Sequence, residues 1–153
     1  MHGYEHTQPG TFIRILIGVS LLAVGAIVIA LLAAGYPPEE TIGLGVPVII
    51  LAIVLPLFHS LTVRISHNEI TLAFGTGLIR KRFINHDVQS ATIVRNRWYY
   101  GWGIRKIRGG WLFNVSGFDA VEIQLRNGRT YRIGTDRPKD LLTAIQTAIN
   151  EPR

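Results

Sequence analysis

Cysteine is absent from the 153 residues, which excludes a disulfide framework and any metal site built on thiolates. Charge is also missing from most of the first 60 residues, where Glu39 and Glu40 are the only charged side chains after Arg14. Residues 61–153 differ, because they carry 15 Lys and Arg against 7 Asp and Glu, a net charge of +8. The composition therefore predicts an apolar N-terminal anchor followed by a basic domain.

Two long apolar runs, uncharged apart from Arg14 near the start of the first, make up the apolar part. The first is "TFIRILIGVSLLAVGAIVIALLAAG" at residues 11–35, and the second is "LGVPVIILAIVLPLFHSL" at residues 44–61. About twenty such residues suffice to span a bilayer. Small residues near the end of the first run also suit a cleaved signal peptide, but this run is too long for a signal core and a second run follows it. We expect a polar tail over residues 1–10 and a transmembrane hairpin over residues 11–61.

The positive charges near the two runs predict their orientation. Arg14 lies near the start of the first run, and the second run is followed by Arg64, Arg80, Lys81 and Arg82. The connecting "YPPEETIG" has no Lys or Arg. Loops rich in Lys and Arg stay in the cytoplasm. We expect a multi-pass protein of the cell inner membrane, with both termini and the basic domain in the cytoplasm.

The two spans show little sign of a transport pathway. Ser20 is polar within the first span, and His59 lies where an interface residue would. Ionisable residues at mid-membrane depth, which mark transport pathways, are missing. Ala26, Ala30 and Ala34 form a face of small residues that lets helices approach closely. This face would pack the two spans together or hold a second copy of the chain in a homo-oligomer.

The basic domain reads as short strands of alternating apolar and polar residues. Asn127-Gly128 predicts a hairpin with a type I′ turn, in which both residues have positive φ. A helix follows from Pro138, because Leu141, Ile145 and Ile149 recur at helical spacing. We expect seven antiparallel strands, closed into a barrel or sandwich and capped by this C-terminal helix. The predicted strands are residues 61–65, 69–74, 78–84, 88–97, 110–116, 120–125 and 129–135.

Two spans followed by this order of strands resemble the bacterial pleckstrin-homology-like membrane proteins. The resemblance covers about residues 61–150 and is carried by "LTVRI", "YYGWGIR", "NVSG" and "RIGTDRP". It implies a mainly β, PH-like cytoplasmic domain over residues 61–150, a membrane location and no assigned chemistry. Eukaryotic proteins of that name bind phosphoinositides or protein partners, but no motif in this sequence supports transferring a phosphoinositide site.

The stretch "RNRWYYGWGIRKIRGGWLFN" at residues 95–114 combines aromatic rings with cations. It contains no Asp, Glu, His, Ser or Cys, so we expect no catalytic residue, no metal site and no cofactor. Cations with stacking rings also suit nucleic acids, but a domain held against a bilayer is badly placed for that, and we expect no nucleic-acid partner. The candidates for lipid or partner binding are Arg95, Arg97, Trp98, Tyr99, Tyr100, Trp102, Arg105, Lys106 and Arg108.

Three interpretations of this stretch stay open. Trp111 and Phe113 share one face of a predicted strand, so we expect core or half-core burial for both. The four rings between Trp98 and Trp102 exceed what a two-faced strand can bury. They would lie at the tip of a glycine turn on the inner leaflet, where Trp and Tyr settle and Lys and Arg attract anionic headgroups. Alternatively, they contact a protein partner or pack internally.

The sequence therefore predicts a non-enzymatic, membrane-anchored PH-like module for binding or assembly, which engages the inner-leaflet surface or a protein partner. The alternative is an accessory subunit of a transporter or secretion assembly.

Overall fold

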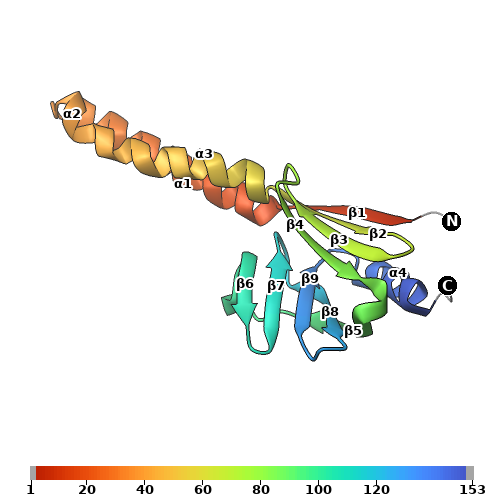
Figure 1. The fold of residues 1–153 in the computed structure, drawn as a ribbon. Helices are drawn as coiled ribbons and strands as arrows, with labels where there is room; N and C mark the ends of the chain where they lie inside the picture. The colour runs from red at the N-terminus through yellow and green to blue at the C-terminus, as the bar shows by residue number, and fades with distance from the viewer. Residues whose placement is uncertain (1–2, 151–153) are drawn as a thin grey trace.

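A helical hairpin projects from one corner of a β domain in the computed structural model, which describes residues 3–150 (Figure 1). Helix α1 (Thr11–Ala33) runs outward, the short helix α2 (Pro38–Thr41) and the 3₁₀ turn η1 (Ile42–Leu44) reverse the chain, and helix α3 (Gly45–Phe58) returns beside α1. At 1.5 Å per residue, α1 is about 34 Å long, slightly more than the hydrocarbon thickness of a bilayer.

The hairpin is inserted between two paired strands. Strands β1 (Tyr4–Pro9) and β2 (Ser60–Ile65) are antiparallel neighbours, from Tyr4 opposite Ile65 to Pro9 opposite Ser60. The first ten residues, expected as a polar tail, therefore contribute a strand. Gly10 donates its N–H to the carbonyl oxygen of His59 at 2.7 Å, and a Cβ on Gly10 would lie 2.8 Å from the carbonyl oxygen of Phe58. Only glycine fits where the two strands continue into the two helices.

The β domain contains two sheets that face each other (Figure 1). Sheet A has the order β1-β2-β3-β4 and sheet B the order β5-β8-β9-β7-β6. Helix α4 packs against β2 of sheet A and against β5 and β8 of sheet B, so it closes one end of the sandwich. The remaining elements are β3 (Glu69–Phe74), β4 (Ile79–Ile84), the 3₁₀ turn η2 (Asn85–Asp87), β5 (Val88–Arg95), β6 (Gly103–Ile107), β7 (Gly110–Asn114), β8 (Asp119–Leu125), β9 (Thr130–Gly134) and α4 (Pro138–Asn150).

Each of the seven predicted strands is present, but the prediction that all pair antiparallel is wrong. Strands β7 and β9 are parallel, from Gly110 opposite Thr130 to Phe113 opposite Ile133. The reason is that β8 and β9 form a hairpin, and β9 inserts between β8 and β7. Alternation of side chains is the same in either direction of pairing, so the sequence pattern could not reveal this. The domain is a mostly antiparallel β-sandwich, with β1 and β6 as additional strands.

The crossing from β7 to β8 is built by a buried asparagine. Asn114 donates its Nδ2 to the carbonyl oxygen of Gly117 at 3.0 Å and accepts the N–H of Ser116 on Oδ1 at 3.2 Å. A side chain at Gly134 on β9 would overlap Asn114 Oδ1. From β1, the buried Gln8 donates its Nε2 to the carbonyl oxygen of Ser116 at 2.9 Å. Parts of "NVSG" and "RIGT" therefore have a structural role in this crossing.

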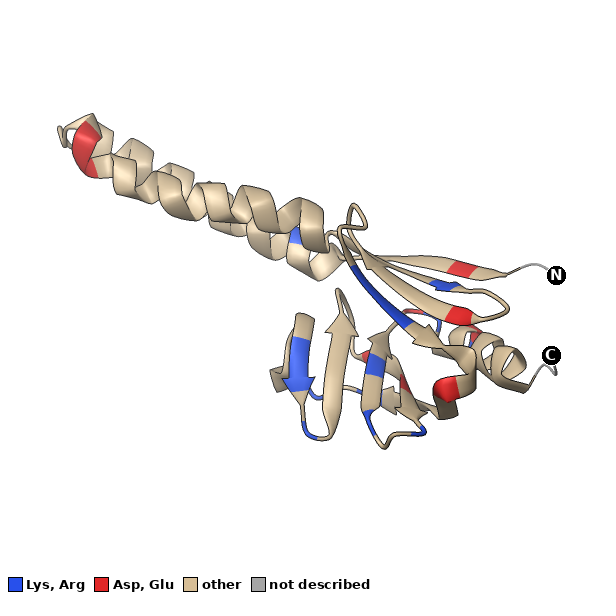
Figure 2. Ribbon diagram, in the orientation of Figure 1, with Lys and Arg blue, Asp and Glu red and all other residues tan. Residues whose placement is uncertain are grey.

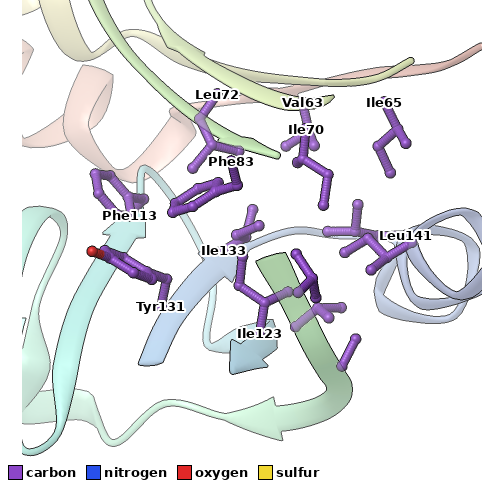
Figure 3. Packing of buried hydrophobic residues seen from close by; sticks show 14 of the residues in the cluster. Val63, Ile65, Ile70, Leu72, Phe83, Phe113, Ile123, Tyr131, Ile133 and Leu141 are labelled. Carbon is purple, nitrogen blue, oxygen red and sulfur yellow. The ribbon is translucent and has the colours of Figure 1, made fainter. Parts of the chain in front are cut away.

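The core lies between the two sheets and α4 (Figure 3). Complete burial of one aliphatic side chain in this core stabilises the fold by about 1.5–3 kcal/mol. The predicted alternation is confirmed on β2, where Leu61, Val63 and Ile65 are buried. The predicted helical spacing is confirmed on α4, where Leu141 and Ile145 are buried. The other inner-face residues labelled in Figure 3 are Ile70, Leu72, Phe83, Phe113, Ile123, Tyr131 and Ile133.

The turn between β8 and β9 is not of type I′. Gly128 has φ +81°, but no residue other than glycine has positive φ within residues 3–150, so Asn127 does not. Instead, Gly128 donates its N–H to the carbonyl oxygen of Leu125 at 2.9 Å, and Leu125 donates to that of Arg129 at 2.9 Å. This is a three-residue turn with glycine in the left-handed region. The hairpin was predicted correctly, but the turn type was not.

Candidate functional site: an aromatic and basic face beside the helices

The candidate stretch contains more secondary structure than its glycines suggest. Strand β5 ends at Arg95, the 3₁₀ turn η3 (Trp98–Tyr100) follows, and the chain then forms β6 along the edge of sheet B. Gly101 with φ +69° and Gly103 with φ +95° allow the reversal between η3 and β6. The expected broad glycine turn therefore includes an edge strand, which pairs with β7 and not with β5.

Two aromatic residues of η3 are on the surface. The exposed fraction is 75% for Trp98 and 55% for Tyr99. The Trp98 and Tyr99 rings meet edge-on with centroids 5.9 Å apart, and the Tyr99 and Tyr100 rings do so at 5.0 Å. Tyr100 is half-buried, because the guanidinium of Arg132 on β9 lies 5.8 Å from its ring centroid. Trp98 and Tyr99 are thus the rings available to a lipid or protein.

Trp102 has a different position from its neighbours. Its ring stacks on Phe12 in the first turn of α1, with centroids 3.6 Å apart and planes 21° apart. It also lies 6.0 Å from the ring of Phe118, after the crossing from β7. Its Nε1 is buried without a hydrogen-bond partner among the described residues. Trp102 therefore packs the candidate stretch against the base of the helical hairpin. The sequence did not predict this contact, because Phe12 was interpreted only as part of a membrane span.

The five cations of the stretch, Arg95, Arg97, Arg105, Lys106 and Arg108, are all exposed. Arg97 donates its Nη1 to the Tyr99 hydroxyl at 2.7 Å, and this hydrogen bond raises the pKa of Arg97. Arg105 donates its Nε to the carbonyl oxygen of Trp102 at 3.2 Å. Successive side chains of a strand point to opposite faces, so Arg105 and Lys106 place charge on both sides of β6.

Phe113 is in the core and Trp111 is only partly buried, within the expected range of core or half-core burial. Both have the same orientation on β7, but Trp111, near the start of the strand, is 43% exposed. Trp111 and Lys106 line a cavity of about 310 Å³ there, together with Arg129 and Tyr131. Lys81 of β4 lies 5.6 Å from the Tyr131 ring centroid. The surroundings of this cavity are therefore basic and aromatic, like η3 and β6.

The candidate stretch lies on the side of the domain toward which the helices extend. Strand β6 is the edge of sheet B on that side, whereas α4 lies at the opposite end (Figure 1). The turn between β3 and β4 also reaches the helices, since Thr76 donates its N–H to the carbonyl oxygen of Pro56 at 3.2 Å. Leu78 in this turn is 80% exposed. An exposed apolar side chain thus lies in the turn that contacts the base of the hairpin.

Metal ligands do not converge in the described part of the chain, where no group of three or more His, Cys, Asp or Glu could hold an ion. Two helical segments, Thr11–Ala33 and Pro38–Phe58, are long and apolar enough to cross a membrane. The chain matches no protein-family model, no curated protein and no solved structure, so no family is identified.

Proposed function

We propose that the chain is a multi-pass protein of the inner membrane whose β domain is a PH-like, non-enzymatic module for binding or assembly in the cytoplasm. The two helical segments support the membrane location, because almost none of their residues are buried within the described chain. Large apolar side chains such as Leu22 and Ile29 point outward. A bilayer covers such surface, whereas water would leave it exposed at a cost of about 25 cal/mol per Å².

The distribution of charge supports the proposed orientation. Glu39 and Glu40 lie at the far tip of the hairpin, and Arg14 lies at its base beside the basic domain (Figure 2). Because Lys and Arg tend to be retained in the cytoplasm, this distribution favours a cytoplasmic domain. The sandwich with its C-terminal helix suits the PH-like resemblance, while the parallel pair of β7 and β9 and the additional strand β1 depart from the predicted strand arrangement.

The observation that carries the proposal is the fixed joint between the helices and the domain. Both helices continue from neighbouring strands of sheet A, and Trp102 stacks on Phe12. This joint holds η3 and β6 at the level where the hairpin would leave the bilayer. Trp98 and Tyr99 then lie at the headgroups with Arg97, which donates to the Tyr99 hydroxyl, and Arg105 or Lys106 on one face of β6 adds a further cation. Each cation near an anionic leaflet contributes about 1 kcal/mol.

A single spin label tests the leaflet contact, because the chain has no cysteine of its own. In full-length protein in lipid nanodiscs, a label at Tyr99→Cys is expected to be shielded from a water-soluble nickel chelate. The matched control is Asn127→Cys, in the exposed turn between β8 and β9. Shielding at residue 99 should be stronger with phosphatidylglycerol than with phosphatidylcholine, and weaker in 1 M salt, where the screening length falls to about 3 Å. Equal exposure of both labels in both lipids would refute the leaflet contact.

The free edge of β6 supports a second candidate function, that of an accessory subunit in a membrane assembly. Strand β6 is at the end of sheet B, so one side of its backbone is open to pairing with a partner strand. In the nanodisc measurement, this function predicts that residue 99 stays exposed to the chelate while chemical crosslinking in cells joins residue 105 or 106 to one defined membrane protein.

A further inference from the structure

A groove lies between α1 and α3 near the end of the hairpin that joins the domain. Its volume is about 490 Å³, and its walls are Ile17, Leu21, Leu55 and Pro56. The groove is open where Gly18 has no side chain, since a Cβ built there would meet nothing within 4 Å. The volume is in the range of about 300–1,000 Å³ that is typical of sites for small ligands. The groove is thus an apolar depression on the surface of the helix pair.

A cation closes the end of this groove that is nearer the domain. Arg14 lines it with His59, and Arg14 donates its Nε to the His59 carbonyl oxygen at 3.2 Å. A guanidinium has five N–H donors, so most of its capacity remains. Among residues 3–150, Arg14 forms no ion pair with a carboxylate. It is also the only Lys or Arg in the first 60 residues. Arg14 lies in the first turn of α1, at the end of the helix that joins the domain, so in a membrane its guanidinium would reach the level of the lipid headgroups.

We propose that this groove binds one anionic glycerophospholipid. An acyl chain lies along the surface left open by Gly18, and the lipid phosphate accepts hydrogen bonds from the free guanidinium N–H groups of Arg14. The apolar groove suits a hydrocarbon chain, and Arg14 at its end suits an anion. A glycerophospholipid carries both groups at adjoining positions, so this arrangement favours a lipid over a protein helix. The site rests on the proposed membrane location and orientation, but it does not depend on the aromatic and basic face formed by η3 and β6.

Lipid titration of the full-length protein in mild detergent, followed by native mass spectrometry, tests the site. The probes are phosphatidylglycerol and phosphatidylcholine with the same acyl chains. We expect one tightly bound phosphatidylglycerol per chain. Gly18→Leu should fill the groove and remove this tight binding. Gly25→Leu is the matched control, because Gly25 is also a glycine of α1 with nothing within 4 Å of its Cβ position, and it should keep the lipid.

The headgroup contact is tested by changing the cation. Arg14→Gln should weaken phosphatidylglycerol binding about fivefold, which corresponds to about 1 kcal/mol, and Arg14→Lys should retain most of it. Arg64→Gln, at an exposed arginine of β2, is the control and should leave binding unchanged. Equal binding of both lipids, or unchanged occupancy in Gly18→Leu, would overturn the proposal. Lipid retained here while residue 99 stays exposed would leave the groove standing and refute only the leaflet contact.

Discussion

Replacing Trp102 with alanine should loosen the joint between the helices and the domain without unfolding the core. The Trp102 ring is half-buried and stacks on Phe12 at 3.6 Å. Truncating a fully buried Trp costs about 3–5 kcal/mol, so about half of that, roughly 2 kcal/mol, is expected here. The stacking itself accounts for about 0.5–1.5 kcal/mol. Since Trp102 Nε1 has no partner among the described residues, no hydrogen bond is lost.

Hydrogen exchange measured by mass spectrometry on the full-length protein in nanodiscs is the suitable assay. Loss of roughly 2 kcal/mol corresponds to about thirtyfold faster exchange through local opening. The acceleration should be confined to segments 97–103 and 10–14, whereas β3 and β8 keep their protection. Trp98→Ala is the matched control, because Trp98 is 75% exposed and surface changes stay within about 0.5 kcal/mol.

A double-mutant cycle separates the ring contact from general packing. Trp102→Ala and Phe12→Ala should be non-additive by about 0.5–1.5 kcal/mol, since the two rings are in contact. Trp102→Phe should restore part of the protection. The reasoning is refuted if Trp102→Ala exchanges like Trp98→Ala, or if the two substitutions at residues 12 and 102 are additive.

Three further predictions concern the domain and its orientation. Gly128→Val should destabilise the domain by about 1–3 kcal/mol in a thermal melt, because a β-branched residue is strained at φ +81°; an unchanged melt contradicts the turn. Glu40→Cys should react with an impermeant maleimide in intact cells and Asn127→Cys should not, and the opposite labelling would reverse the orientation. Residues 61–153 alone should unfold more easily than the same chain with residues 3–10 joined before it by a short turn; equal stability would mean that β1 contributes nothing.

The sequence correctly predicted those strands and helices that bury one side in the core, because their apolar residues recur at regular spacing within a short segment. Leu61, Val63 and Ile65 alternate with polar residues, and the strand they predict is present. Strand β1 was missed because its inward side chains include His6 and Gln8, whose partners are distant in the chain. His6 hydrogen-bonds Asp136 at 2.5 Å, and Gln8 reaches the crossing after β7. No apolar period marks such a strand.

The candidate stretch was only partly predictable for the same reason. Its aromatic content indicated that some rings must be exposed, and Trp98 and Tyr99 are. Which rings these are depends on contacts that the local pattern does not contain. Trp102 meets Phe12, and Tyr100 lies against Arg132. Trp111 has the same orientation on β7 as Phe113, as expected, but is only partly buried.

Insertion of the helices between β1 and β2 explains why such a polar segment forms a strand at all. Pairing residues 4–9 with residues 60–65 requires closure of a loop of about fifty residues, which is entropically unfavourable. Antiparallel packing of α1 and α3 brings residues 10 and 59 together, and the 2.7 Å hydrogen bond between them continues the strand ladder. The helical hairpin therefore provides the closure that β1 needs. Because β1 in turn contacts the crossing after β7 through Gln8, the helical hairpin and both sheets are joined through β1, and the orientation of the aromatic and basic face follows from that of the helices.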